Sequence, residues 1–189
     1  IYKKGFKAFL QLEKSLSVHS VDAYLRDIDK LASYLEPIKA IHTPADIEMK
    51  HLQGFIQSIG EIGMAATSQA RIIYGIKSFF KYCLIEQICS INPTTLLPSP
   101  KTSRKLPDVL SFEEIEQMIG EIDLSKPEGG RNKAILEVMY SSGLRVTEAI
   151  QLKISCLYLD VGFIRVIGKG DKERLVPIGD SASRYIQLY

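Results

Sequence analysis

The sequence has no long apolar run and almost balanced charge. Of its 189 residues, 46% are hydrophobic and 24% are charged, but no apolar stretch approaches the ~20 residues of a membrane-spanning helix. The segment from Ile1 to Lys7 also lacks the apolar core of a signal peptide. We therefore expect a globular cytoplasmic protein with no membrane role. The net charge of +2 is too small to indicate a nucleic-acid partner, because a basic footprint must be local to bind phosphate.

Cysteine and histidine are also scarce, with three residues of each type. The spacings of Cys83, Cys89 and Cys156 match no zinc-ligand pattern, and an odd number of cysteines argues against a disulfide framework. The histidines all lie in the first half of the chain: His19, His42 and His51. We expect reduced thiols and no metal site.

The first half has apolar residues at steps of three and four, which predicts helices throughout. The first helix should bury a face made of Tyr2, Phe6, Phe9, Leu10 and Leu12. A second helix should begin at Ser17 or Ser20 and end at Pro37, and a third should open at Thr43 or Asp46 with Pro44 in its first turn. The fourth, over about residues 66–87, carries an apolar stripe that ends at Leu84. We predict an all-α four-helix domain over residues 1–91.

Residues 92–110 are predicted to form an extended linker, because four prolines between Asn92 and Pro107 exclude a helix. This linker also carries Lys101, Arg104 and Lys105 with no acidic residue among them.

Residues 111–189 predict a mixed α/β unit. Ser111 and Glu114 have the spacing of a capping box, and further helices are expected over residues 131–141, from Val146 onward and over residues 181–189. Short β-branched runs predict strands over residues 157–159, 163–167 and 174–178. The last two strands flank Gly168-Lys169-Gly170-Asp171, so we expect an antiparallel hairpin with a basic tip.

Two stretches contain residues suited to anion chemistry. In SSGLRVTEAIQL, Gly143 should set Arg145 at a helix start, with Glu148 on the same face. Glu148 could orient the Arg145 guanidinium or make an ordinary surface ion pair. In RVIGKGDKERLVPI, Lys169 stands between two glycines, either as a solvated turn or as a cation that reaches a bound ligand.

Together and in this order, the two stretches closely resemble the tyrosine recombinases, also called the phage integrase family, and within them the Xer-type enzymes. The segments TSQARIIYGIKSFFKYC, NPTTLLPSPK and LPDVLSFEEIEQMI resemble the corresponding Xer segments, so the resemblance covers essentially the whole chain. It implies a core-binding (SAM-like) four-helix domain, followed by the first part of a mixed α/β catalytic domain with a small antiparallel sheet. The implied function is site-specific DNA recombination, either in chromosome dimer resolution or in mobile-element integration and excision.

The resemblance also implies catalytic roles. Arg145 matches the first catalytic arginine, Lys169 the hairpin lysine, and Glu148 the acidic residue that supports the arginine. Guanidinium groups neutralise charge on phosphate oxygens, and a desolvated lysine can protonate the departing 5′-oxygen. Lys172 is the alternative candidate for the lysine that protonates the departing oxygen. No metal, nucleotide or other cofactor is implied.

The family's later motifs are absent: a histidine-x-x-arginine, a histidine or tryptophan, and the nucleophilic tyrosine. Tyr158, Tyr185 and Tyr189 lack the flanking motif of that nucleophile. We expect the chain to be the front portion of a longer enzyme and to be inactive alone. Two alternatives are a catalytically inactive DNA-binding homologue of the same architecture and a helical interaction module without a DNA role.

The expected partner is a double-stranded recombination site gripped by a homo- or hetero-tetramer, with a second recombinase as an option. The resemblance places the fourth helix against DNA. In the same context, the cations of the linker and the hairpin become candidates for contacts with the phosphate backbone. The candidate DNA contacts are Thr67, Ser68, Arg71, Lys77, Lys81, Lys101, Arg104, Lys105, Lys172 and Arg174.

Overall fold

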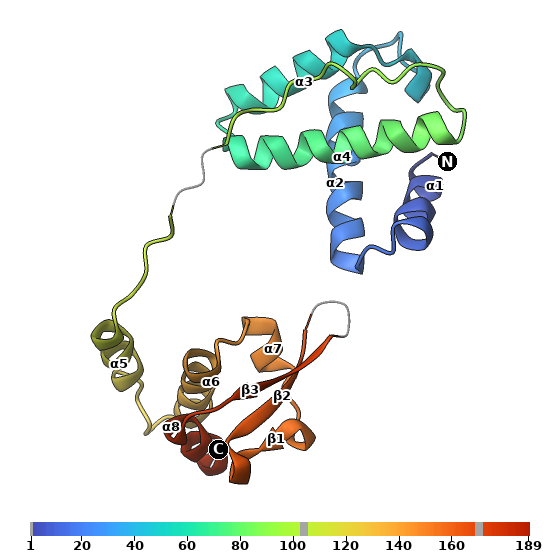
Figure 1. Ribbon diagram of the computed structural model, residues 1–189. Coiled ribbons are helices and arrows are strands. Elements are labelled where there is room, and N and C mark those ends of the chain that lie inside the picture. The colour runs from blue at the N-terminus through green and yellow to red at the C-terminus, as the bar shows by residue number, and fades with distance from the viewer. Residues whose placement is uncertain (1, 103–105, 169–171) are drawn as a thin grey trace. The chain divides into compact units, whose positions relative to one another are not determined.

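The computed structural model describes residues 2–102, 106–168 and 172–189. The chain divides into two compact units, Ile1–Lys105 and Leu106–Tyr189. The first unit is helical, and the second combines helices with a small sheet (Figure 1).

The helical unit is built around its longest helix, α4, which packs against both α2 and α3 (Figure 1). Its elements are α1 (Tyr2–Ala8), the π-helical turn η1 (Phe9–Glu13), α2 (Val18–Leu35), the 3-10 turn η2 (Pro44–Asp46), α3 (Met49–Glu61) and α4 (Ala66–Ile85). The core contains fully buried side chains from α1, η1, α3 and α4, including Phe6, Leu10, Leu52, Ile72, Ile76 and Phe80. The predicted all-α domain is therefore confirmed.

Local chemistry sets most helix starts as predicted. Ser17 is the N-cap of α2, where its hydroxyl accepts the backbone N–H of Ser20. The predicted start of the third helix at Thr43 or Asp46 is wrong. The Asp46 carboxylate accepts the backbone N–H groups of His42 and Thr43 and closes a separate turn. The backbone is then extended at Ile47, and α3 begins only after Glu48.

Two leucines assigned to apolar faces are exposed instead. Leu12 is 80% exposed because it follows Leu10 by two residues, and helical residues two apart lie on opposite sides of the helix. Leu84 is 43% exposed in the last turn of α4. The apolar stripe of α4 is still buried at Phe80, but it is no longer covered one turn later at Leu84. Periodicity identified the buried face in both helices but not where it ends.

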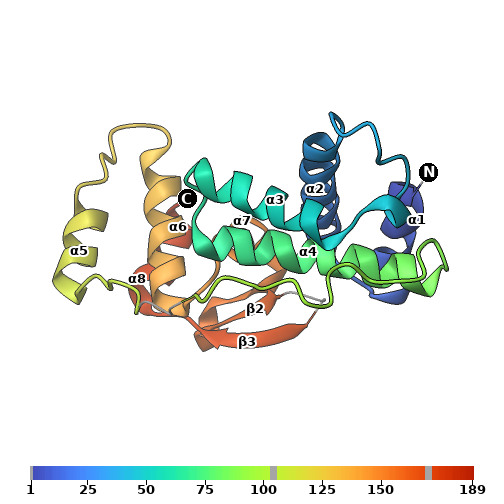
Figure 2. The same cartoon turned by 90° about the horizontal axis from the view of Figure 1, so that it is seen from above.

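The segment after α4 returns along that helix (Figures 1 and 2). Asn92 begins a tight turn in which its side-chain carbonyl accepts both the backbone N–H and the hydroxyl of Thr94. Leu97 then buries its side chain in the helical core. We keep residues 1–91, 92–110 and 111–189 as the proposed domain division, with the start of the linker packed on the first domain.

The second unit contains an antiparallel three-stranded sheet in the order β1-β2-β3. Its elements are α5 (Phe112–Gly120), α6 (Gly129–Ser142), α7 (Val146–Ile150), η3 (Ile154–Cys156), β1 (Leu157–Tyr158), η4 (Leu159–Val161), β2 (Phe163–Ile167), β3 (Glu173–Pro177) and α8 (Asp180–Leu188). The predicted capping box of Ser111 and Glu114 starts α5. The expected hairpin is β2 and β3, with Arg165 opposite Leu175.

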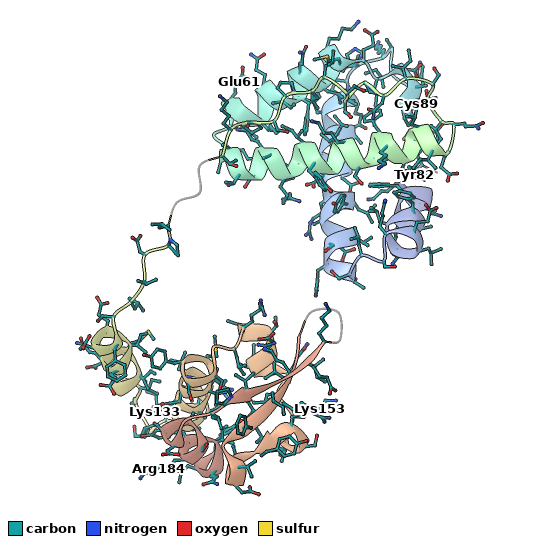
Figure 3. The ribbon with its side chains drawn as sticks, in the orientation of Figure 1. Glu61, Tyr82, Cys89, Lys133, Lys153 and Arg184 are labelled. Atoms are coloured by element: carbon teal, nitrogen blue, oxygen red, sulfur yellow. The ribbon has the colours of Figure 1, made fainter. Side chains whose placement is uncertain are left out.

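The core of this unit lies where α6, α8 and the sheet meet. Ile164 and Val166 point inward from β2 against Val138 of α6 and Ala182 of α8. At the α6–α8 contact, Lys133 Nζ lies 4.7 Å from the ring centroid of Tyr185, and Figure 3 labels Lys133 there. No helix within the described residues combines the length and apolar character needed to cross a lipid bilayer.

Candidate functional site

Arg145 stands at the junction between α6 and α7. Gly143 ends α6 in the left-handed conformation with φ of 58°, a geometry that glycine adopts at low cost. The buried Leu144 follows, and Arg145 is the N-cap of α7 with extended backbone. The turn therefore anchors the chain through Leu144 and leaves the Arg145 side chain 75% exposed.

Glu148 holds both the backbone and the side chain of Arg145. Its carboxylate accepts the Arg145 backbone N–H at 2.8 Å and a guanidinium N–H at 3.1 Å. The Glu148 side chain is only 5% exposed. The contact is therefore not a pair between two exposed side chains: a buried carboxylate fixes an exposed guanidinium.

The same carboxylate is shared with Arg174 of β3. Two N–H groups of Arg174 donate to the two Glu148 oxygens, each at 2.9 Å. This two-point contact is the strongest arrangement of an arginine with a carboxylate. The hydrogen bonds from Arg174, followed by the backbone N–H of Arg145, lower the pKa of Glu148 to about 2. In return, Glu148 raises the pKa of Arg174.

The base of the β2–β3 hairpin reaches this cluster. Gly168 donates its backbone N–H to the carbonyl oxygen of Lys172 at 2.8 Å. A Cβ atom at position 168 would lie 3.2 Å from a guanidinium nitrogen of Arg174 and 3.4 Å from a carboxylate oxygen of Glu148. Glycine thus allows the hairpin to approach the pair. Lys169 follows directly and lies outside the described residues, whereas Lys172 is exposed.

Two serines of the SSGLR stretch join this region to the end of β3. The Ser142 hydroxyl donates to the carbonyl oxygen of Pro177 at 3.0 Å, and the Ser141 hydroxyl accepts the backbone N–H of Gly179 at 2.6 Å. Sequence patterns could not predict these contacts, since 35 and 38 residues separate the partners. They fix α6 against β3 beside the Glu148 cluster.

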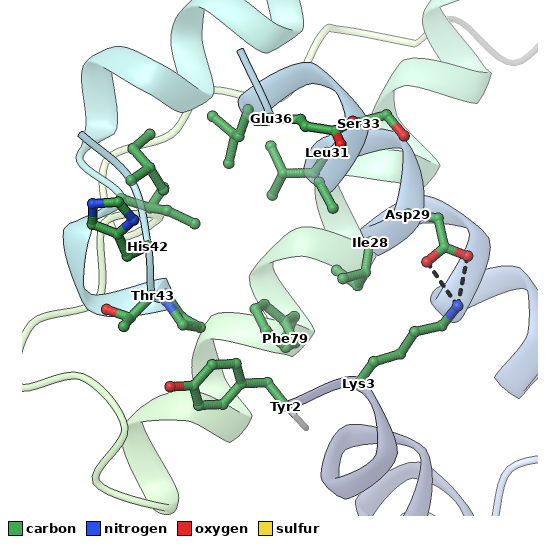
Figure 4. Close-up of a pocket in the computed structure, with 15 residues that line it drawn as sticks. Tyr2, Lys3, Ile28, Asp29, Leu31, Ser33, Glu36, His42, Thr43 and Phe79 are labelled. Atoms are coloured by element: carbon green, nitrogen blue, oxygen red, sulfur yellow. Dashed lines mark hydrogen bonds and ion pairs between the residues drawn. The ribbon is translucent and has the colours of Figure 1, made fainter. Parts of the chain in front are cut away.

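A hollow of about 470 Å³ borders Glu148 and Gly168 on the sheet side. Arg165 lines it, with one guanidinium nitrogen 3.7 Å from the Cys156 sulfur and its Nε buried without a hydrogen-bond partner among the described residues. A larger hollow of about 710 Å³ lies in the helical unit between α1, α2 and the segment around Thr43 (Figure 4). None of the residues predicted to act on DNA lines this larger hollow.

The predicted DNA contacts of the helical unit lie along α4. Thr67, Ser68 and Arg71 are exposed in its first turns, whereas further along Lys81 is exposed and Lys77 is half-buried. In the linker Lys101 is exposed, while Arg104 and Lys105 lie outside the described residues.

Arg71 has a partner that the sequence did not indicate. Two of its N–H groups donate to the two carboxylate oxygens of Asp27, each at 2.8 Å, although 44 residues separate the two positions. Asp27 stands in an ordinary helical pattern, so the sequence alone does not distinguish it from a surface carboxylate.

No metal centre is formed by the described residues, among which no three His, Cys, Asp or Glu side chains are grouped to hold an ion. All three cysteines are buried free thiols. Burial raises the pKa of Cys83 to about 12, so this thiol is un-ionised at neutral pH.

Comparison with known proteins identifies relatives of both units. Residues 4–87 match the model of the phage integrase N-terminal SAM-like domain, and residues 108–189 match that of the phage integrase family. Tyrosine recombinase XerD of Staphylococcus haemolyticus is 41% identical over 181 residues, which are 96% of this chain and 61% of the relative. XerD of Listeria monocytogenes is 38% identical over 98% of this chain and 63% of its own length. The chain thus spans about three fifths of these relatives.

Solved structures show the same fold at lower identity. A lambda integrase tetramer bound to a Holliday junction has a TM-score of 0.77 at 15% identity, over 99% of this chain and 55% of that one. The XerH recombinase bound to its difH substrate has a TM-score of 0.73 at 21% identity, over 99% of this chain and 57% of that one. With two family models that together cover most of its length and XerD relatives near 40% identity, the chain belongs to the phage integrase family, as a Xer-type tyrosine recombinase.

Proposed function

We propose that this chain supplies the DNA-binding unit and the first catalytic residues of a site-specific recombinase that cuts and rejoins duplex DNA through a 3′-phosphotyrosyl intermediate. The observation that carries the proposal is the exposed Arg145 guanidinium held by the buried Glu148 carboxylate. A cation fixed in advance stabilises the charge that develops on a phosphate without the cost of reorganisation. This is what phosphoryl transfer requires of its arginines.

In the proposed reaction, Arg145 binds nonbridging oxygens of the scissile phosphate. The phenolate oxygen of a tyrosine supplied from outside residues 1–189 bonds to phosphorus while the bond to the 5′-oxygen breaks. Lys169 gives its proton to that departing oxygen, and the 3′ end stays joined to the protein. The position of Gly168 beside Glu148 and Arg174 supports this pairing of Arg145 with the hairpin lysine. Guanidinium and ammonium groups neutralise the charge, so the proposal needs no metal or cofactor.

The proposed substrate is a double-stranded recombination site, and the proposed assembly is a tetramer. Both are supported by proteins of the same fold: XerH is bound to its difH substrate, and lambda integrase forms a tetramer on a Holliday junction. A second, non-identical recombinase could complete the tetramer. We assign phosphate contacts to the exposed face of α4, to the basic linker and to the hairpin. Arg174 keeps this assignment in addition to its contact with Glu148, since its side chain is 38% exposed. Action on DNA would place the protein in the cytoplasm.

The biological task that we propose is Xer-like, either resolution of chromosome dimers or movement of an integrated element. The alternative of an inactive DNA-binding homologue is less well supported. The relatives near 40% identity are XerD tyrosine recombinases, and this chain carries Arg145, Glu148 and Lys169 at the positions that the family pattern assigns to catalysis.

Covalent trapping tests the function directly. The full-length protein would be incubated with fragmented genomic DNA of its own organism and denatured with detergent, and the DNA that remains attached to protein would be sequenced. We expect one recurrent site to be enriched. Binding without any covalent product would favour the inactive homologue, and absence of both would remove the recombinase proposal.

A further inference from the structure

Asp27 is a buried carboxylate at the contact between α2 and α4. Its side chain is 2% exposed, whereas the Arg71 side chain that it binds is 52% exposed. Burial raises the pKa of Asp27, and the hydrogen bonds from Arg71 oppose that rise. The pair therefore spans the boundary between the core and the surface, with its acid inside and its base at the start of α4.

The fold is shaped to admit this carboxylate. A Cβ atom at Gly75 would lie 2.8 Å from one Asp27 oxygen, so α4 carries a glycine at the point where Asp27 meets it. Gly75 is itself buried in the middle of α4, where glycine costs about 1 kcal/mol relative to alanine. Gly75 thus lowers the intrinsic stability of α4 but leaves the space that the Asp27 carboxylate occupies beneath Arg71.

Stability alone explains this arrangement poorly. A buried ion pair gives up hydration on both partners and is often no more stable than well-packed apolar side chains of similar volume. The arginine, however, gains a fixed position. Two of its five N–H groups are held by Asp27, and the other three have no side-chain acceptor among the described residues. Thr67 and Ser68 lie one helical turn before it.

We propose that Asp27 is a positioning residue for DNA binding, which fixes the Arg71 guanidinium from inside the helical unit so that its remaining N–H groups meet a phosphate of the duplex. This inference rests on the proposed function and adds a specific contact to it. Asp27 does not touch DNA in this proposal. It acts by holding Arg71 in the orientation that binding requires, which reduces the side-chain entropy lost on binding.

The experiment compares two asparagine substitutions on the same helix. Asp27→Asn and Asp29→Asn each remove one negative charge, but Asp29 makes an exposed pair with Lys3 (Figure 4). Affinity of the full-length protein for a short fluorescent duplex of mixed sequence would be measured between about 50 and 200 mM salt. Thermal unfolding of each variant would be recorded alongside.

Charge alone predicts that both variants bind DNA at least as tightly as the parent. Positioning predicts instead that Asp27→Asn binds about tenfold more weakly than Asp29→Asn. It also predicts a salt slope smaller by about one unit, as expected for one lost phosphate contact. A loss of thermal stability would not by itself change that slope. Equal affinity and equal slopes for the two variants would overturn the proposal.

A second variant keeps the test decisive if Asp27→Asn fails to fold. Arg71→Lys retains the positive charge at an exposed position, but an ammonium cannot hold both Asp27 oxygens and a phosphate in the same plane. We expect the same weakening and the same reduced slope, and parental binding by Arg71→Lys would overturn the proposal. If the parent itself binds no duplex, the proposed function fails, which is a different result from a parent that binds and variants that do not differ.

Discussion

Glu148 and Arg174 are joined by two hydrogen bonds of 2.9 Å across 26 residues of sequence. Because Glu148 also holds Arg145, this contact links β3 of the hairpin to the helix start that carries the proposed catalytic arginine. The hairpin that bears Lys169 and the α7 terminus that bears Arg145 thus share one carboxylate as their anchor. A substitution of Arg145, Glu148 or Arg174 should therefore change the positions of the other two side chains.

Replacement of Arg174 by lysine should reduce DNA cleavage more than DNA binding. A lysine retains the charge but cannot span both Glu148 oxygens, so Glu148 would hold Arg145 less rigidly. We expect a single-turnover cleavage rate lower by about 10- to 100-fold in the full-length enzyme. Arg184→Lys on the exposed face of α8 is the matched control and should leave the rate unchanged. An Arg174→Lys enzyme with the parental rate would show that this anchor is dispensable.

Acid should expose the contribution of Glu148 to stability. Its pKa is about 2 in the folded protein, against about 4.3 for an unfolded chain. Because the folded value is lower, the ionised carboxylate stabilises the fold fully above about pH 4.5, and the contribution is lost as pH falls from there through about 2. As the pH is lowered over that range, the midpoint temperature of thermal unfolding should therefore decrease more steeply for the full-length protein than for its Glu148→Gln variant. Parallel curves would contradict the assigned pKa.

Gly143→Ala should destabilise the protein by about 1 kcal/mol. No atom lies within 4 Å of the added Cβ, so the cost comes from the left-handed backbone alone. Gly130→Ala in α6 is the control, since its Cβ also meets nothing within 4 Å and its backbone is not left-handed. That substitution should stabilise the helix by about 0.5–1 kcal/mol. Denaturant unfolding distinguishes the two, and equal effects would contradict the backbone explanation.

Lys169→Ala should be rescued by a better leaving group. If Lys169 protonates the departing 5′-oxygen, a substrate with sulfur at that position needs no such proton and should be cleaved by the variant at close to the parental rate. Lys172→Ala should lose DNA affinity through its assigned phosphate contact, but the sulfur substrate should give this variant no advantage over the parent. If the sulfur substrate gives Lys169→Ala no advantage, the general acid is a different group.

Local signals in the sequence predicted most helices and strands correctly. The features that the sequence did not predict depend on tertiary contacts. Ser111 with Glu114, and Gly143 after α6, act within one turn of chain, and both act as expected. The third helix start was wrong because the carboxylate of Asp46 closes a turn of its own.

The candidate site shows the same limit more clearly. The family pattern could indicate Arg145 and Glu148, because they are three residues apart. It could not indicate that the exposed-looking cations Arg71 and Arg174 are each bound at two points by a buried carboxylate, since those partners are 44 and 26 residues away. Only the packing of α2 on α4, and of α7 beside β3, brings the partners together.

The proposed role of Arg145 is tested by the Arg145→Ala substitution in the full-length protein, measured on the site recovered by covalent trapping. DNA binding and covalent complex formation would be followed on the same samples. We predict that duplex binding is largely retained while the covalent protein–DNA complex is lost. A variant that binds and forms that complex at the parental rate would contradict the role of Arg145 as the fixed cation of the reaction.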